Sequence, residues 1–267
     1  MRSAGSWFGT PALTFDADLT ACAEIVQSGD PDRFAAVMAS PVAARRMLFP
    51  LYAFNVEVSR APWVTQEPMI AEMRLQWWRD AVEEIGLRKP VRRHPVVTPL
   101  ALVANPQDVA VLDRLIAARR WDIYKDAFED AAHFARYLSQ TAGGLMWAAA
   151  QALGAQDTQK DIVMRFGAAT GLARYLQAVP ELEARGRIPL LDGRAEALRD
   201  LAQSALDTLP TRSSLIRSLP KPARPAVTEG WMTQAILKQV VRDPGRVGQG
   251  ALGHSPFRQR LSLIRWA

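Results

Sequence analysis

Apolar positions recur with a helical period along almost the whole chain. They return every three or four residues, and no segment combines β-branched residues with a hairpin turn such as Asn-Gly. Helix stop signals such as Gly29, Gly86 and Gly154 divide this pattern into separate segments. The pattern therefore predicts an all-α chain.

The stop signals place the helices in order. We expect them over 16–28, from 31 onward, and over 42–60, 66–85, 105–124, 130–153, 157–179, 194–209, 228–241 and 256–267. Asp30-Pro31 is a typical helix start, because aspartate accepts from free backbone N–H groups and proline fits the first turn. Pro180 is expected to break a helix, and three prolines in 219–225 predict a linker. Gly143-Gly144 is expected to let a neighbouring helix approach closely.

Composition is that of an ordinary globular protein. The 267 residues are 49% hydrophobic and 22% charged. One cysteine, Cys22, leaves no internal disulfide and favours a reducing compartment. The longest apolar run, 142–150, is too short to cross a bilayer of ~30 Å, and we see no secretory signal. We expect a cytoplasmic protein.

The net charge of +6 permits an anionic partner, such as a diphosphate or an anionic membrane surface. Nucleic acid is not expected, because the chain has no basic run and no zinc spacing. His94, His133 and His254 have no neighbours at ligand spacing, so no metal site is predicted. The last segment, 256–267, alternates arginines with apolar residues, which suits contact with a membrane surface or a partner, and equally a helix that closes the domain.

Several sequence blocks resemble the squalene/phytoene synthases, a family of head-to-head prenyltransferases. In chain order the blocks are 30–34, Arg46, 51–54, 74–79, 94–95, 167–176 and 186–190. Blocks that follow one another in the family's order are more specific than any one alone. The resemblance implies an isoprenoid synthase fold, a single helical bundle with a central cavity, over 30–267, preceded by an N-terminal helix and lead-in over 1–29.

The first metal-binding motif of that family is empty of acids here. Family members ionise an allylic diphosphate with Mg²⁺ held by two facing helices, each with aspartates at i and i+4 on one face. A Tyr-Ala-Phe block leads into the first pair. Here Tyr52 opens that block, Asn55 follows it, and Ser59 and Trp63 stand at the aspartate positions.

The second motif has also lost its acids. The positions that resemble the family's polar and acidic residues read Gly171, Arg174, Gln177, Ala178 and Leu182. None of these side chains holds Mg²⁺, although Arg174 suits an anion. The resemblance therefore implies no metal and no cofactor, with Mg²⁺ required only if prenyl transfer is retained.

The nearest acids are not expected to replace the missing pairs. Glu57 lies about 200° around the helix from Ser59. Glu181 and Glu183 follow the expected break at Pro180. We expect all three to be surface carboxylates or to pair with nearby arginines.

One branch of the family, which contains an assembly factor of mitochondrial respiratory complex I, shares the wording of residues 52–57 and lacks the acidic pairs. The resemblance thus implies a catalytically degenerate protein that assembles complex I, with a complex I subunit or intermediate as its partner, at the inner face of a membrane. Two alternatives stay open: an active prenyl-diphosphate transferase, and a lipid or isoprenoid binding protein without turnover. Candidate pocket or anion contacts are Arg46, Arg74, Trp78, Tyr137, Arg174, Tyr175 and Arg187.

Overall fold

The computed structural model describes residues 17–104 and 106–266, and within these ranges every regular element is helical. The α-helices are α1 (Ala17–Gly29), α2 (Pro31–Met38), α3 (Val42–Arg60), α4 (Pro68–Gly86), α5 (Val97–Val103), α6 (Pro106–Ala118), α7 (Ala131–Leu138), α8 (Gly144–Ala152), α9 (Lys160–Ala184), α10 (Ala195–Asp207), α11 (Arg212–Ser218), α12 (Thr233–Arg242), α13 (Gly245–Gly248) and α14 (Pro256–Trp266). The 3₁₀ segments are η1 (Ala61–Trp63), η2 (Arg119–Asp122), η4 (Asp157–Gln159) and η5 (Lys221–Gly230), and η3 (Ser139–Gly143) is a π-helix. The predicted all-α class is confirmed.

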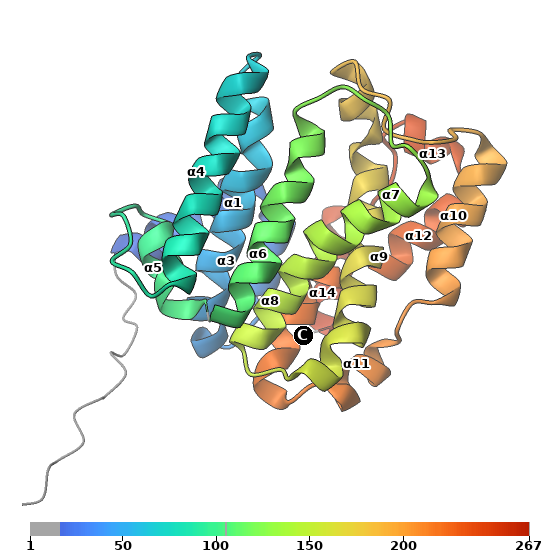
Figure 1. Cartoon of the computed structure of the whole chain (residues 1–267). Coiled ribbons are helices and arrows are strands. Elements are labelled where there is room, and N and C mark those ends of the chain that lie inside the picture. Colours follow the sequence, from blue (N-terminus) through green and yellow to red (C-terminus); the bar gives the residue numbers. More distant parts are fainter. Residues whose placement is uncertain (1–16, 105, 267) are drawn as a thin grey trace, which may run out of the picture.

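The helices form two halves that meet along α8 and α9. Helices α1, α3, α4 and α6 lie side by side in one half, and α7, α9, α10 and α12 make up the other (Figure 1). Each half has its own apolar cluster, around Phe49, Phe54 and Trp147 in the first and around Tyr175, Leu176 and Leu237 in the second. Burial of such large side chains contributes roughly 1.5–3 kcal/mol each, so the two clusters supply most of the driving force for folding.

Helix α8 runs through the middle of the fold. Its first seven residues, 144–150, are all buried, which explains why this stretch is apolar on every face. A helix that is apolar all round belongs in the centre of a large core, and no helix among the described residues has both the length and the apolar character needed to cross a membrane. The apolar run 142–150 is therefore a core element.

Local signals explain several helix starts. The Asp30 carboxylate accepts from the backbone N–H of Arg33 at 2.9 Å, and Pro31 occupies the first turn of α2. Asp130 caps α7 in the same way, accepting from His133 at 2.7 Å. The predicted helices over 42–60, 66–85 and 194–209 match α3, α4 and α10 to within two residues at each end. The caps expected at Asp16 and Asn105 lie outside the described residues.

Close backbone contact between helices is confirmed at the glycines. A Cβ atom added at Gly167 of α9 would lie 2.8 Å from Gly143 Cα, a distance that real side chains do not tolerate. The predicted helix over 130–153 is continuous through this contact, but it is wound as a π-helix at η3. The glycines thus let α9 rest directly on the backbone of η3.

Three sequence expectations were wrong. Pro180 does not break its helix: α9 continues to Ala184, because burial of Leu176 and Val179 outweighs the one backbone hydrogen bond that proline removes. The segment over 219–225 is not a linker, because Leu219 and Ala223 are buried and the prolines begin the 3₁₀ segment η5, which packs against α8. For the same reason α12 begins at Thr233 instead of 228.

Two further boundaries differ. Helix α6 ends at Ala118 and the chain continues as the 3₁₀ segment η2, where one α-helix to about 124 was expected. Helix α11, over Arg212–Ser218, was not predicted. The division of the chain at residue 30 stays a prediction.

Candidate functional site

A cavity of about 550 Å³ lies between α3 and α9, the two helices that carry the motif positions. It is lined by Asn55, Val56, Ser59, Arg60 and Trp63 on one side, by Gly171, Arg174, Tyr175, Ala178, Glu181, Leu182 and Arg185 on the other, and by Gly29, Asp30, Arg33, Val64, Arg119, Asp122, Tyr137, Leu138, Thr141, Ala142 and Leu145 around them. The two helices thus face each other across open space.

Most of the first-motif residues line this cavity. Asn55, Ser59 and Trp63 follow one another along the inner face of α3 and η1. Tyr52 is different: it is fully buried beneath the cavity, with the Arg33 guanidinium 5.0 Å from its ring centre. Its hydroxyl has no hydrogen-bond partner. Burial raises the pKa of Tyr52 well above the usual value, so the phenol stays neutral.

The second-motif residues divide in the same way. Gly171, Arg174, Ala178 and Leu182 line the cavity from α9. Gln177 does not, because its side-chain amide donates to the carbonyl of Leu252 at 3.3 Å. Four of the five positions therefore face the opposite motif, as the resemblance implies.

The remaining candidate contacts lie in several places. Tyr137 and Tyr175 line the cavity, and burial raises the pKa of both phenols, so both stay neutral. Arg187 is buried beside the cavity, where it donates to the carbonyls of Asp122 and Trp121 at 2.8 and 2.9 Å. It therefore holds η2 in place.

Like Arg187, the three remaining candidates are outside the cavity lining. Trp78 packs edge-on against Phe54 in the first core cluster. Arg74 is exposed on α4, and Arg46 is half-buried with no hydrogen-bond partner for its Nε atom. Core packing is the observed role of Trp78.

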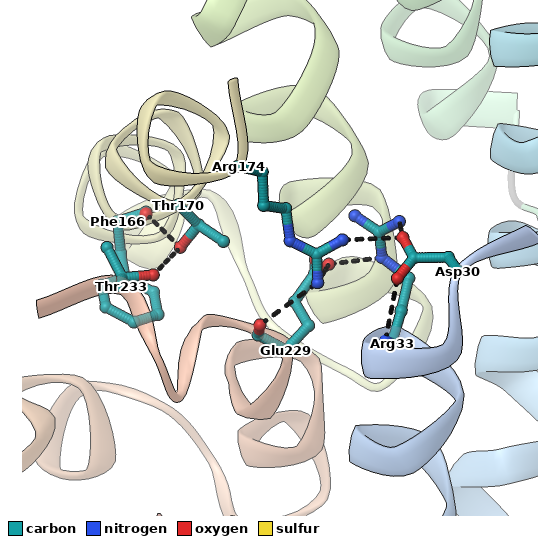
Figure 2. A network of polar contacts seen from close by, with 7 residues as sticks. All are labelled: Asp30, Arg33, Phe166, Thr170, Arg174, Glu229 and Thr233. Carbon is teal, nitrogen blue, oxygen red and sulfur yellow. Dashed lines mark hydrogen bonds and ion pairs between the residues drawn. The ribbon is translucent and has the colours of Figure 1, made fainter. Parts of the chain in front are cut away.

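Three lining residues, Asp30, Arg33 and Arg174, form an ion-pair network with Glu229 (Figure 2). Arg33 pairs with Asp30 and, through its Nε atom, with Glu229 at 2.5 Å. Arg174 reaches the same two acids, with 2.7 Å between its Nη1 atom and Asp30 Oδ2 and 3.9 Å between Nη2 and Glu229 Oε2. Two arginines and two carboxylates thus neutralise each other and join α2, α9 and η5.

Pairing favours the charged forms of Asp30 and Arg33. The side chains of Arg33 and Glu229 are only 5% and 2% exposed, so this pair is shielded from water. Burial raises the pKa of Asp30, but Arg33 and Arg174 lower it more, to about 2. For Arg33, burial lowers the pKa, and the neighbouring Asp30 and Glu229 carboxylates raise it above its usual value. Asp30 and Arg33 are therefore charged at neutral pH.

Arg119, Asp122 and Tyr137 form a second polar cluster in the cavity lining. Arg119 donates through Nη1 to Asp122 at 3.1 Å and to the Tyr137 hydroxyl at 2.8 Å, and that hydroxyl donates to Asp122 at 3.0 Å. The Nε atom of Arg119 is buried and has no partner. The Asp122 carboxylate is thus already bound by both an arginine and a tyrosine.

Trp63 stands beside the end of α9 in the cavity wall. The guanidinium groups of Arg185 and Arg187 are 4.9 and 5.4 Å from the Trp63 ring centre. Glu181 lines the cavity here, contrary to the expectation that it follows a helix break, and it pairs with Arg185 at 2.6 Å. The expected pairing of acids with arginines is confirmed for Glu181 and for Glu57, which lies 3.5 Å from Arg60.

These side chains do not fit a magnesium site. At the positions where the resemblance implies aspartates, the cavity wall has Ser59, Trp63, Ala178 and Leu182, and the carboxylates that do line the cavity are paired with arginines. Across 17–104 and 106–266 no three histidine, cysteine, aspartate or glutamate side chains gather so as to hold a metal ion. Mg²⁺ in proteins takes free carboxylates and water.

Three residues of the two polar clusters were not predicted. Asp30 and Arg33 were present in a sequence block of the resemblance, but Arg119, Asp122 and Glu229 were not singled out. Glu229 lies 196 residues from Arg33, and nothing in local sequence connects the two. The only sequence signal for Glu229 was an acidic residue close to the prolines that precede α12.

Comparison with known proteins identifies relatives of two kinds. The chain is similar to NADH dehydrogenase (ubiquinone) complex I assembly factor 6 of Mus musculus, with 25% identity over 244 residues, 83% of this chain and 73% of that protein. The human protein of that name is 23% identical over the same length. A Drosophila melanogaster homolog is 30% identical over 193 residues, 69% of this chain, and the match spans 57% of that protein.

Solved structures share the fold. A dehydrosqualene synthase superposes with a TM-score of 0.74 at 15% identity, covering 93% of this chain and 95% of that one. A squalene synthase from Alicyclobacillus acidocaldarius gives 0.69 at 18% identity, covering 92% and 98%. These superpositions show that the chain has the isoprenoid synthase fold. The family model for squalene/phytoene synthase matches residues 26–190, most of the 267-residue chain, and the chain therefore belongs to that family.

Proposed function

We propose that this protein is a catalytically degenerate squalene/phytoene synthase that acts in the assembly of respiratory complex I. One observation carries the proposal: Ser59, Trp63, Ala178 and Leu182 face the cavity at the positions where the family's aspartates are expected. The relatives named complex I assembly factor 6 support the role in assembly. The partner is then a complex I subunit or an intermediate, met at the inner face of a membrane.

The magnitude of the chemical loss supports a role without turnover. Removing one preorganised group that stabilises developing charge commonly costs ~10²–10³ in rate. Four carboxylates are missing here. Arg174 faces the cavity in the second motif, but its guanidinium is already paired with Asp30 and Glu229. Little free charge is left on these helices to neutralise a diphosphate leaving group.

Deletion of the gene tests the assembly role. We expect the amount of assembled complex I and its NADH dehydrogenase activity to fall, while another respiratory complex in the same membranes is unchanged. Expression of the wild-type chain restores both. Unchanged complex I in the deletion strain would refute the proposal.

A turnover assay tests the loss of catalysis separately. The purified protein is incubated with farnesyl or geranylgeranyl diphosphate and Mg²⁺, with an active dehydrosqualene synthase as positive control. We expect no condensed product above background. Formation of product would restore the alternative of an active prenyl-diphosphate transferase.

The open cavity favours a second candidate function, the binding of a lipid or isoprenoid without turnover. A volume of about 550 Å³, with Val56, Leu138, Leu145 and Leu182 in its wall, lies in the usual range of small-molecule pockets. Mass spectrometry of an organic extract of the purified protein tests for such a ligand. In Ala178→Trp an indole fills the cavity, and in the control Ala184→Trp it stands on the exposed end of the same helix.

The pair of variants separates the outcomes. A ligand found with the wild type and with Ala184→Trp, but absent from Ala178→Trp, supports binding in this cavity. No ligand in the wild type, or equal amounts in both variants, contradicts it.

A further inference from the structure

Helix α14 presents a stripe of large apolar side chains to solvent. Phe257, Leu261 and Ile264 follow at spacings of four and three residues, so they share one face of the helix. They are 76%, 38% and 74% exposed. We call these three residues the apolar stripe. Single exposed apolar residues are common, but three in register on one helix are the pattern of a surface that binds something.

The opposite face of α14 fixes the helix to the body of the protein. Leu263 packs against the second core cluster, and the Trp266 indole stacks on Phe166 of α9 with 5.7 Å between ring centres and 12° between planes. The Arg212 guanidinium also donates to the carbonyl of Trp266 at 2.7 and 3.0 Å, which caps the end of the helix. The apolar stripe therefore points outward because the other face is used for packing.

Arginines flank the apolar stripe on both sides. Arg258 and Arg265 each follow a stripe residue by one position, and Arg260 precedes one, so at about 100° per residue they project to opposite sides of it. All three are exposed, and the helix contains no acid. No ion pair among the described residues includes any of these three arginines, whereas Arg79 and Arg92 are examples of arginines that do pair with a carboxylate.

We propose that α14 docks this protein on an anionic membrane surface. An interfacial helix places its apolar side chains at the boundary of the acyl chains, and flanking arginines reach the phosphates of the lipid head groups. Both requirements are met by the same face of α14. A second copy of the chain suits this face poorly, because pairing two apolar stripes would bring six arginines together without an acid from either helix. The charge of the face thus favours lipid phosphate.

This inference goes beyond the role in complex I assembly and is tested apart from it. The purified full chain is sedimented with vesicles of phosphatidylglycerol and phosphatidylcholine, and with vesicles of phosphatidylcholine alone. We expect binding to the anionic vesicles that weakens as salt is raised, because exposed charges are screened. A chain that stays in solution with anionic vesicles at low salt overturns the proposal, whatever the outcome of the gene deletion.

Substitutions in the apolar stripe test its part in binding. Phe257→Ser/Ile264→Ser should lower partition onto anionic vesicles by at least about tenfold. The control Met69→Ser/Met73→Ser removes two equally exposed apolar side chains from α4 and should bind as the wild type does. Equal partition of the stripe variant and the wild type overturns the proposal. The proposal is also overturned if the stripe substitutions abolish self-association of the chain and leave vesicle binding unchanged.

The arginines are tested in the same assay. Each arginine near an anionic surface strengthens partition about fivefold, so Arg258→Ala/Arg260→Ala/Arg265→Ala should weaken it by ~10²-fold on anionic vesicles. Far-UV circular dichroism and the urea midpoint of each variant verify folding. Both should match the wild type, because the substituted side chains are exposed. Undiminished binding by the folded triple variant contradicts a role of these charges.

Discussion

Asp30 and Asp32 stand two residues apart at the start of α2, yet we expect removal of their charges to have opposite effects on the free energy of unfolding. Asp30 is ionised against Arg33 and Arg174, and these arginines outweigh burial and lower its pKa to about 2 from 3.8. For Asp32, burial is the largest cause and raises the pKa. Asp30→Asn and Asp32→Asn remove one charge each without changing side-chain size, and asparagine still caps a helix as well as aspartate does. The substitution at Asp30 thus isolates the charge from the cap.

The expected loss for Asp30→Asn follows from its pKa. A difference of about 1.8 units at 1.36 kcal/mol per unit gives a loss of about 2 kcal/mol in the free energy of unfolding at pH 7. Because the folded pKa is the lower one, this contribution is complete above the unfolded value of 3.8 and is lost as pH falls through 2. At pH 3 the difference between variant and wild type should be about half as large.

Asp32→Asn is the matched control. Burial raises the pKa of Asp32 in the folded state, so the free energy of unfolding falls as pH rises through that pKa and the carboxylate forms. Removing the charge should therefore raise the free energy of unfolding slightly at pH 7. Urea unfolding, followed by circular dichroism and by tryptophan fluorescence at pH 7 and at pH 3, measures both variants. Equal losses for the two variants, or a loss for Asp30→Asn that does not change with pH, would refute the assignment of these charges.

Three further substitutions test the packing around the cavity. Pro180→Ala should raise the free energy of unfolding by about 1–2 kcal/mol in urea titrations, because α9 passes through this position and alanine restores a backbone donor; a loss would mean that the proline ring itself packs. Gly230→Ala should cost about 1–3 kcal/mol in the same titration, since its Cβ would lie 2.4 Å from a Phe166 ring carbon, and full stability would contradict this close approach. Trp63→Ala removes the ring beneath Arg185 and should lower the stability measured by thermal unfolding by about 1 kcal/mol, whereas an unchanged midpoint argues against that contact.

Local patterns predicted the helices well where clear breakers mark their ends. The helix over 42–60 was placed correctly because Ala61-Pro62 interrupts its apolar pattern, although residues 48–56 of α3 are buried on every face. The pattern misled at Pro180, where the cost of a proline is smaller than the gain from burying Leu176 and Val179 around it. A local rule cannot weigh tertiary packing that it does not contain.

The candidate site was predicted in part for the same reason. Helical spacing and the family resemblance placed Ser59, Trp63 and Ala178 together, and the structure brings them to one cavity. The ion pairs at the cavity were not predicted, because Arg33 and Glu229 come together only in the folded chain. The expected helix break before Glu181 was wrong, because α9 continues through Pro180, but Glu181 is exposed and pairs with an arginine as predicted.

The glycine contact between α9 and η3 limits which side chains position 171 accepts. A Cβ atom at Gly171 would lie 2.6 Å from the Cβ of Ala142, closer than two side chains can approach. A polar or acidic side chain at this position therefore requires that η3 move away from α9. A single substitution at Gly171 cannot add a metal ligand to this wall of the cavity without that movement.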